Sequence, residues 1–501
     1  MSKVRIAITA SLLLLIASLS TEFFRPVRSA PPSKLAGADV LIAEVLGPSP
    51  LAETLRILCD EIGGRPTGSA ALGRAVSWGV ENFRKAGVDD VHTEKFIVPQ
   101  SWQEGATKVE VTSPVHFEVK AVSVAWAPPI SGLDAPVLDV GEGTVADFSK
   151  LEANARGAIL LVHSRPMVSL DDLFNEYIKA PGIVNEAVRV GAAALVFMST
   201  RPRNLLYRHT NSQRGQLDRL PMAILAREDA MRVARLIESR SQVRMNLSLP
   251  NRIGGPFEAE NVVAEIRGSE RPDEVVILGA HLDSWELGTG ALDNGCNAAL
   301  VIDVARAIHD APIRPRRTLR FILFSGEEQG LLGSKAYVHQ HRDEMDKIVA
   351  VTIFDEGVGR VSGYSLGGRK DTEPPLAEIL RPVQDWGSNI QTTDAFIGTD
   401  NFDFLLEGIP TLVANQDPTD YLPNYHASSD TLDKVDLREL KVQEAYAAVT
   451  VLGIAERAER VGMRQSRAQV EALLAETQLD QQMKTFGLWS EWESGRRGRQ
   501  K

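Results

Sequence analysis

One segment, from Val275 to Glu328, restricts the fold of this chain more than any other. It contains two short apolar runs, Val275 to Leu278 and Leu319 to Phe324, and each is followed within a few residues by a helical pattern. Runs of this length and composition are typical of buried parallel strands, which have helices on both faces of the sheet. The segment therefore predicts a β-α-β unit in an α/β fold.

Acidic and histidine side chains stand where these strands should end. His281 and Asp283 follow the first run, Asp293 precedes the helix, and Glu327 and Glu328 follow the second run. In an open α/β sheet, ligands bind outside the carboxyl ends of the strands. We therefore expect these side chains at the edge of the sheet where chemistry takes place.

Two more residues fit the same rule downstream. A third apolar run, Ile348 to Phe354, leads to Asp355, and His426 follows the run Thr411 to Ala414 through a polar loop. Imidazole and carboxylate ligands suit zinc, and five such groups exceed what one tetrahedral ion requires. The pattern predicts two metal ions that share a ligand.

Six motifs in order resemble the co-catalytic zinc exopeptidases, a family that includes bacterial leucyl aminopeptidases and glutamate carboxypeptidases. They extend from His281 to beyond Asp430: HLDS, GALDN, FSGEEQGLLGS, FDEG, GTDNFDF with EGIP, and YHASSDT. Trp285, the arginine-rich break before the second strand and Glu-Glu-Gln-Gly are most similar to the plasma glutamate carboxypeptidases. Each motif alone recurs by chance, whereas six in order are specific.

The resemblance implies a ligand set for two zinc ions. Asp293 would bridge them. His281 and Asp355 would complete the coordination of one ion, and Glu328 and His426 that of the other. The Asp293–Asn294 peptide bond is expected to be cis, as it is in the family.

The resemblance also implies a mechanism of peptide hydrolysis. The nucleophile would be a metal-bridged hydroxide, because zinc lowers the pKa of water from about 15.7 towards ~7. Glu327 would be the general base, and Asp283 would orient His281. Tyr425 could donate to the developing oxyanion. A tyrosine that only packs under the loop is the alternative left open.

The same resemblance gives the expected architecture: an α/β, phosphorylase/hydrolase-like mixed sheet flanked by helices, with an inserted protease-associated domain. The catalytic domain would comprise residues 30–114 and 252–460, and the insert residues 115–251. GAILLVHSR, a helix predicted over Ile183 to Val190, and GAAALVFMS carry the likeness to that domain. It would cap the cleft without supplying metal ligands. A plain insertion without substrate contact is the alternative.

Residues 461–501 are expected to form a helical tail beyond the family core. Its aromatic residues would dock on the body or on a partner subunit, and its terminal basic cluster, GRRGRQK, would be solvated. A homodimer is an expectation from relatives.

Residues 1–29 have the arrangement of a secretory signal peptide. Two positive charges in Met1 to Arg5 precede an apolar run, Ile6 to Leu19, which is too short for a comfortable membrane span. A secreted or periplasmic enzyme is therefore expected, with an uncleaved N-terminal anchor as the alternative. Cys59 and Cys296 are expected to be free buried thiols.

Composition narrows the possible partners. The net charge of −11 argues against nucleic acid and anionic membranes. The expected partner is a short peptide or dipeptide. Which end of the peptide is recognised stays open: Asp400 is a candidate for binding an amine, and Arg360 and Arg369 are candidates for binding a carboxylate.

Two other functions are weighed against this interpretation. A catalytically inactive, receptor-like relative would need a defect outside the intact ligand set. A serine hydrolase could use Ser365, which lies in a G-x-S-x-G sequence. In such an enzyme the chain passes directly from a strand into a helix at the nucleophilic serine. Here Gly367 and Gly368 and then two prolines follow Ser365, which does not fit the start of a helix.

Overall fold

The computed structural model describes residues 37–210, 215–387 and 389–500. The expected signal peptide lies outside these residues. Among the helices that are described, none has the length and apolar character that a bilayer crossing requires.

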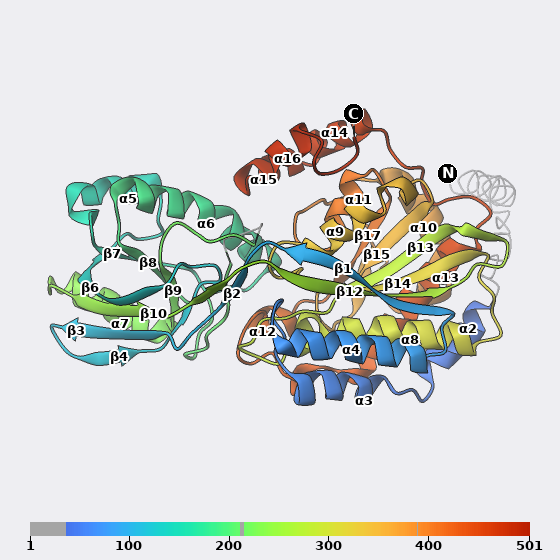
Figure 1. Cartoon of the computed structure of the whole chain (residues 1–501), viewed down its shortest axis with the longest axis horizontal. Helices are drawn as coiled ribbons and strands as arrows, with labels where there is room; N and C mark the ends of the chain where they lie inside the picture. The colour runs from blue at the N-terminus through green and yellow to red at the C-terminus, as the bar shows by residue number, and fades with distance from the viewer. Residues whose placement is uncertain (1–36, 211–214, 388, 501) are drawn as a thin grey trace, which may run out of the picture. The chain divides into compact units, whose positions relative to one another are not determined.

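A seven-stranded mixed sheet, called the main sheet below, forms the framework of the molecule (Figure 1). Its four central strands are parallel, and the outer strands β1, β12 and β16 are antiparallel to their neighbours. The predicted β-α-β unit is β13, α8 and β14. In spatial order the strands are β1 (Asp90–Val98), β12 (Phe257–Ile266), β14 (Arg317–Phe324), β13 (Arg271–His281), β15 (Ile348–Ile353), β17 (Thr411–Gln416) and β16 (Val361–Ser365).

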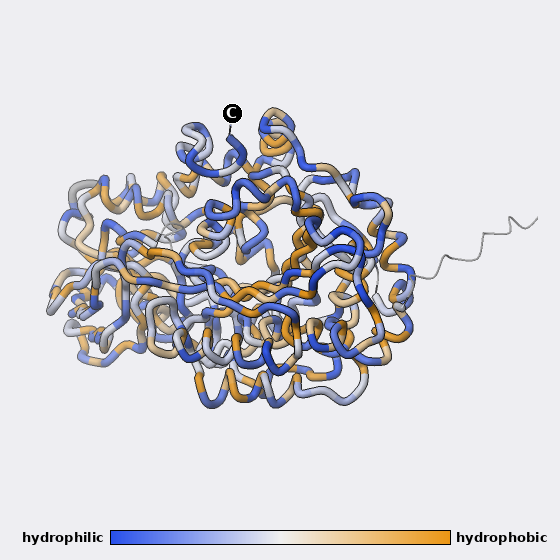
Figure 2. The backbone as a smooth tube through the Cα atoms, turned by 45° about the vertical axis from the view of Figure 1, so that its right-hand side comes forward, coloured by the Kyte–Doolittle hydropathy of each residue, from blue (hydrophilic) through white to orange (hydrophobic). Residues whose placement is uncertain are grey.

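Helices cover both faces of the main sheet, which explains the almost continuous apolar character of its central strands. On one face lie α4 (Ala70–Lys85), α8 (Cys296–Asp310) and α13 (Leu437–Glu456). On the other, α9 (Leu332–Gln340) and α11 (Phe402–Leu406) place Tyr337 and Phe404 in one core cluster with Ile322 and Ile353. Figure 2 shows helices with alternating hydrophobic and hydrophilic stretches, as expected of helices with one buried side.

Shorter helices join these layers. They are α2 (Ala38–Leu46), α3 (Leu51–Arg56), α10 (Glu373–Ile379) and α12 (Tyr421–Asn424), with a π-helical turn at Ile57–Ile62. Cys59 and Cys296 are buried and free, as expected.

A second sheet of eight strands contains the expected insert and one strand that precedes it. Its strands, in spatial order, are β4 (Phe117–Val119), β3 (Lys108–Ser113), β10 (Arg244–Leu249), β6 (Ile130–Asp139), β7 (Ile159–Val162), β8 (Ala194–Met198), β9 (Met222–Leu225) and β5 (Ala121–Ser123). Helices α5 (Val145–Leu151) and α6 (Leu170–Val190) pack on one face, and α7 (Arg227–Glu238) packs on the other. The chain leaves the main sheet after β1 and returns to it at β12. In these two connecting segments, β2 (Ser101–Gln103) and β11 (Arg252–Gly254) pair as a short ribbon.

Two boundaries differ from the sequence prediction. Strand β3 pairs with β10 of the second sheet, so that sheet begins at Lys108 rather than after residue 114. An alternating strand pattern fixes the buried face but does not identify the sheet it joins. Helix α6 begins at Leu170, well before the predicted Ile183, and contains Pro181. Proline usually marks a helix boundary, which hid the first half of this helix.

The C-terminal tail docks on the main-sheet part of the chain. Its helices α14 (Arg467–Glu476), α15 (Leu479–Thr485) and α16 (Trp489–Glu493) bury Leu474, Met483 and Trp492 against Phe402 and Leu406. The expectation of a solvated basic terminus is wrong for Arg497, whose guanidinium is buried and bonded to Asp403.

Candidate metal centre

The carboxyl ends of the four parallel strands carry the predicted ligands. His281 ends β13, Glu328 follows β14, Asp355 follows β15, and His426 follows β17 and α12. Asp293 lies in the turn Ala291–Gly295, just before α8. The structure therefore brings all five residues to one edge, as strand-end placement predicted.

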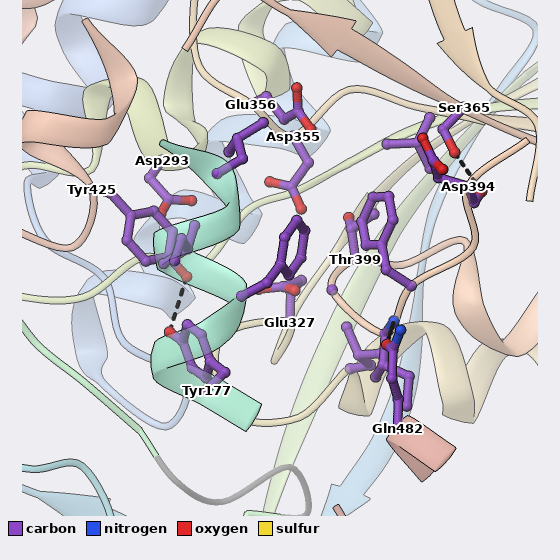
Figure 3. A pocket seen from close by; sticks show the side chains of 18 of the residues that line it. Tyr177, Asp293, Glu327, Asp355, Glu356, Ser365, Asp394, Thr399, Tyr425 and Gln482 are labelled. Carbon is purple, nitrogen blue, oxygen red and sulfur yellow. Dashed lines mark hydrogen bonds between the residues drawn. The ribbon is translucent and has the colours of Figure 1, made fainter. Parts of the chain in front are cut away.

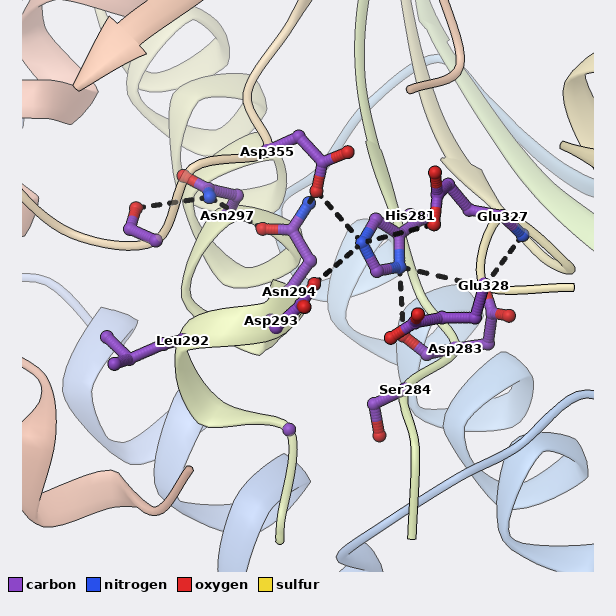
Figure 4. Close-up of polar contacts among 12 residues, drawn as sticks. His281, Asp283, Ser284, Leu292, Asp293, Asn294, Asn297, Glu327, Glu328 and Asp355 are labelled. Carbon is purple, nitrogen blue, oxygen red and sulfur yellow. Dashed lines mark hydrogen bonds and ion pairs between the residues drawn. The ribbon is translucent and has the colours of Figure 1, made fainter. Parts of the chain in front are cut away.

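The five residues form two groups that share Asp293. In the first group, His281 Nε2 lies 2.9 Å from Asp355 Oδ1 and 3.1 Å from Asp293 Oδ1 (Figure 4). In the second, His426 Nε2 lies 2.8 Å from Glu328 Oε2 and 3.2 Å from Asp293 Oδ2. One oxygen of Asp293 thus faces each histidine, which is the arrangement that a bridging carboxylate needs.

The turn that carries Asp293 is fixed by two residues from distant parts of the chain. Asp430 accepts hydrogen bonds from the backbone N–H groups of Ala291, Leu292 and Asp293. The buried Arg65 guanidinium donates to the carbonyls of Thr289 and Gly290. The Asp293–Asn294 peptide bond is cis, as expected.

The donor set fits a pair of divalent cations. Three buried carboxylates and two imidazoles converge, and Glu328 Oε1 is buried without a hydrogen-bond partner. Burial raises the pKa of Glu328 to about 7, and it also raises that of Asp355. Carboxylates concentrated in this way need positive charge beside them to ionise, and nitrogen and oxygen donors together suit zinc.

Glu327 and Asp283 stand beside the first group. Glu327 Oε2 lies 4.0 Å from His281 Nε2, outside both ligand groups. The Asp283 carboxylate accepts hydrogen bonds from the Thr67 hydroxyl and the Glu327 backbone N–H. His281 Nδ1 is closer to the Asp283 carbonyl, at 3.0 Å, than to its carboxylate, at 3.7 Å. The contact that orients His281 therefore comes mainly from the backbone carbonyl of Asp283 rather than from its carboxylate.

Tyr425 lies over the second group and is linked to the insert. Its ring stacks on that of His426, with centroids 3.7 Å apart. Its hydroxyl lies 3.0 Å from the hydroxyl of Tyr177 on α6 (Figure 3). Burial raises the pKa of both phenols well above the usual range, so both stay protonated. Sequence reasoning missed Tyr177, which belongs to the undetected half of α6.

A cavity of about 520 Å³ opens above the ligands. Helix α6 lines one part of it with Leu170, Phe174 and Ile178, and the tail lines another with Gln482 and Phe486. Four acidic residues outside the ligand set also line it: Asp171, Glu327, Glu356 and Asp394. No lysine or arginine lines the cavity among the residues that the structure describes.

The other candidates are placed differently. Ser365 lines the cavity, but its hydroxyl donates to the carbonyl of Asp394, and β16 ends there without entering a helix (Figure 3). Arg360 is exposed and pairs with Glu439. Arg369 is buried against Asp371 and backbone carbonyls. Asp400 is buried and outside the cavity lining.

Comparison with known proteins identifies the family. Residues 261–451 match the model of peptidase family M28. Carboxypeptidase Q of Mus musculus is 29% identical over 414 residues, which cover 81% of this chain and 85% of the mouse protein. Leucine aminopeptidase 2 of Trichophyton rubrum is 29% identical over 288 residues, which cover 56% of this chain and 52% of that protein.

Solved structures agree on the fold. A peptidase M28 precursor from Shewanella amazonensis superposes with a TM-score of 0.77 at 25% identity, covering 86% of this chain and 99% of that one. A zinc aminopeptidase from Bacillus subtilis gives a TM-score of 0.64 at 19% identity, covering 83% and 97%. The matched segment contains the five candidate ligands and Glu327. The chain belongs to peptidase family M28, the co-catalytic zinc exopeptidases, and is a zinc-dependent exopeptidase.

Proposed function

We propose that this exopeptidase uses two zinc ions to hydrolyse short peptides or dipeptides from a free amino terminus. His281 and Asp355 would hold one ion and Glu328 and His426 the other, with Asp293 shared. The observation that carries the proposal is the pair of ligand groups with Asp293 in common, beneath the acidic cavity.

The residues around the ligands would transfer the proton and stabilise the charge that develops on the substrate. When bound, two zinc ions polarise the scissile carbonyl and lower the pKa of water. Glu327 accepts a proton from the attacking water and delivers it to the leaving amine. Asp283 fixes the Glu327 backbone through its N–H. The Tyr425 hydroxyl, kept protonated by burial, donates to the oxygen on which negative charge develops.

The charge of the cavity supports recognition of the substrate amine. Glu356 and Asp394 line it, and the described lining residues include no lysine or arginine that could hold a terminal carboxylate. Apolar side chains from α6 and Phe396 would contact the N-terminal side chain of the substrate. A cavity of about 520 Å³ suits a ligand of dipeptide size.

A carboxypeptidase is the second candidate. Sequence similarity to carboxypeptidase Q over 81% of the chain favours it. In a dipeptide both ends lie close to the metals, so the two activities can be separated only with blocked substrates.

We also propose that the second sheet with α5, α6 and α7 is the protease-associated domain and that the enzyme is exported. The position of α6 at the cavity supports a capping role. Export rests on the sequence pattern of residues 1–29. Mass spectrometry of the mature protein tests it through the new N-terminus.

The test of function is a substrate panel: an unblocked dipeptide with an apolar first residue, its N-acetyl form and its C-terminal amide. Each is assayed with a zinc chelator, with zinc added back, and with a serine-directed reagent. We expect zinc-dependent turnover of the free dipeptide and the amide, and none of the acetylated form. Loss of turnover on amidation alone would identify a carboxypeptidase, and loss with either block a dipeptidase. Activity that survives chelation but not the serine reagent would overturn the proposal in favour of Ser365.

A further inference from the structure

The backbone at His426 has a conformation that its own segment supports only in part, through a hydrogen bond from the Ala427 N–H to the Asn424 carbonyl. His426 has a φ of 55°, in the left-handed region that non-glycine residues rarely adopt. It follows α12, a helix of only four residues. Such a conformation persists only where surrounding structure determines it. Further supporting contacts come from the insert.

A short piece of the insert pairs with this segment like a strand. The Arg208 N–H donates to the His426 carbonyl at 2.9 Å, and Tyr207 and Ala427 form an antiparallel bridge. The His426 ring then donates from Nδ1 to the Arg208 carbonyl at 2.9 Å. Because a carbonyl can only accept, Nδ1 carries a proton, and Nε2 is the ring atom that faces Glu328 and would bind a metal ion.

The Arg208 side chain holds its own backbone in place. Its guanidinium is fully buried and donates to the Ser123 carbonyl and to the carboxylates of Glu104 and Glu286. It also lies over the ring of Trp285, 5.8 Å from the centroid. This network joins the insert to the segment that follows His281, so the Arg208 carbonyl cannot move independently of the metal centre.

The two histidines of the centre are therefore supported differently. The acceptor for His281 Nδ1 is the Asp283 carbonyl, two residues along the same segment. The acceptor for His426 Nδ1 is 218 positions away, in the insert. Only the Glu328–His426 half of the centre takes this orienting contact from the insert.

We propose that Arg208 is a positioning residue for the Glu328–His426 half of the metal centre, and that the insert thereby sets the affinity of one of the two zinc ions. The proposal rests on the two-zinc function proposed above. Groups that orient metal-ligating histidines typically change metal affinity by about 10–100-fold when altered. The His281–Asp355 half should be unaffected.

The test is zinc binding to the full chain, measured by elemental analysis during competition with graded chelators. Arg208→Ala is expected to keep one zinc at wild-type affinity and to bind the second about 10–100-fold more weakly. Arg208→Lys, which keeps the charge, should recover part of that loss. Cobalt(II) titration gives an independent readout, because the spectrum of one half-site should change and that of the other should not.

The matched control is Arg317→Ala. Arg317 is equally buried and paired with Glu274, but it opens β14 at the opposite end of the strand from Glu327. It should lower stability and leave both zinc affinities unchanged. The double variant Arg208→Ala/His426→Ala should bind the second zinc no more weakly than His426→Ala alone, since Arg208 acts through the His426 ring.

Three outcomes would overturn the proposal. Wild-type affinity for both ions in Arg208→Ala would show that the insert does not position His426. An equal loss of both ions in a folded Arg208→Ala protein, or the same pattern in Arg317→Ala, would show a general structural role. A wild-type protein that binds no zinc at all would remove the proposed function itself, and this result is distinguishable from the other two.

Discussion

Glu327 has the position of a proton carrier rather than that of a ligand. It neighbours the candidate ligand Glu328 in sequence, yet its carboxylate lies outside both candidate ligand groups and lines the cavity. Its backbone N–H is bonded to the buried Asp283 carboxylate. The turn after β14 thus directs two adjacent glutamates to different sides of the centre, as the separate roles in the proposed function require.

Glu327→Gln is expected to lower kcat by about 10²–10⁴-fold, the contribution of a positioned general base. Bound zinc should stay at the wild-type ratio, because Glu327 is in neither ligand group. Steady-state kinetics on the dipeptide and elemental analysis measure the two quantities. Glu373→Gln, at an exposed position, is the control. A zinc-loaded Gln variant with normal kcat would exclude Glu327 as the base.

The position of a candidate site residue was predictable from the sequence where it depends on residues close to it in the chain. The five candidate ligands follow strands that the apolar pattern reveals, and strand ends are a fixed place for ligands in this fold class. Tyr177 and Arg208 were not predictable, because their contacts join residues 248 and 218 positions apart. The residues around Tyr177 and Arg208 form no local sequence pattern that indicates such a contact.

At the level of elements, the packing of α13 on α8 buries a carboxyl pair beside one ammonium. Lys441 Nζ lies 3.0 Å from Glu444 Oε2 and 2.9 Å from Asp303 Oδ2. Burial, followed by the charge of Asp303, raises the pKa of Glu444 well above its usual range. Because the folded pKa exceeds the unfolded value of about 4.3, the stabilising contribution is full below that value and is lost as pH rises through the folded pKa.

Glu444→Gln should therefore gain in unfolding temperature relative to the wild type when pH is raised from about 5 to about 8. The amide stays neutral, whereas the wild-type carboxyl must either ionise in a buried place or hold its proton. Thermal melts of the zinc-loaded proteins across this range measure the difference. Glu471→Gln, at an exposed position, should show a pH-independent difference. A Glu444→Gln curve parallel to the wild type would contradict the assignment.

A fully buried ion pair helps to attach the tail, beside the apolar contacts of its helices. Arg497 Nε lies 2.8 Å from Asp403 Oδ1, and Nη2 lies 2.7 Å from Oδ2. Both side chains are 2% exposed. The pair fixes the segment after α16 against α11, in the same cluster that holds α15 beside the cavity.

Arg497→Ala should lower the free energy of unfolding by about 3–5 kcal/mol, because it leaves the Asp403 charge buried and unpaired. It should also raise KM, since Gln482 and Phe486 line the cavity. Denaturant unfolding and substrate kinetics test the two effects. Arg496→Ala, one residue earlier and exposed, is the control. Equal behaviour of the two variants would show that the tail is held by other contacts.

Most elements were predictable, and the errors have definite physical causes. The four parallel strands of the main sheet, β13, β14, β15 and β17, coincide with the four apolar runs of the sequence. Helix α6 was predicted only after Pro181, because proline normally ends a helix. The burial of Arg497 could not be predicted from a basic cluster, since its partner Asp403 is 94 positions away.

For the whole molecule, metal binding and folding are coupled. Three carboxylates of the ligand set and the neighbouring Glu327 lie close together in a buried place. Without cations they repel one another or take up protons. Ions that bind only the folded chain stabilise it by mass action, by about 2.7 kcal/mol at a free concentration 100 times Kd.

Removal of zinc with a chelator should lower the unfolding temperature and abolish peptide hydrolysis together. Zinc added back should restore both, while magnesium should not, because imidazole ligands suit zinc. Calorimetry and the dipeptide assay on the same samples measure the two effects. An unfolding temperature that is insensitive to chelation would mean that the ligand groups hold no tightly bound ion.

The cavity walls have a consequence for the order of events during synthesis. Helix α6 is made before any of the ligands, and Gln482 and Phe486 are made after all of them. A ribosome that has just added His426 has therefore synthesised every candidate zinc ligand but not the tail residues that line the cavity. The cavity of a nascent chain at that stage is unfinished, and it is complete only when α15 has been made and has docked.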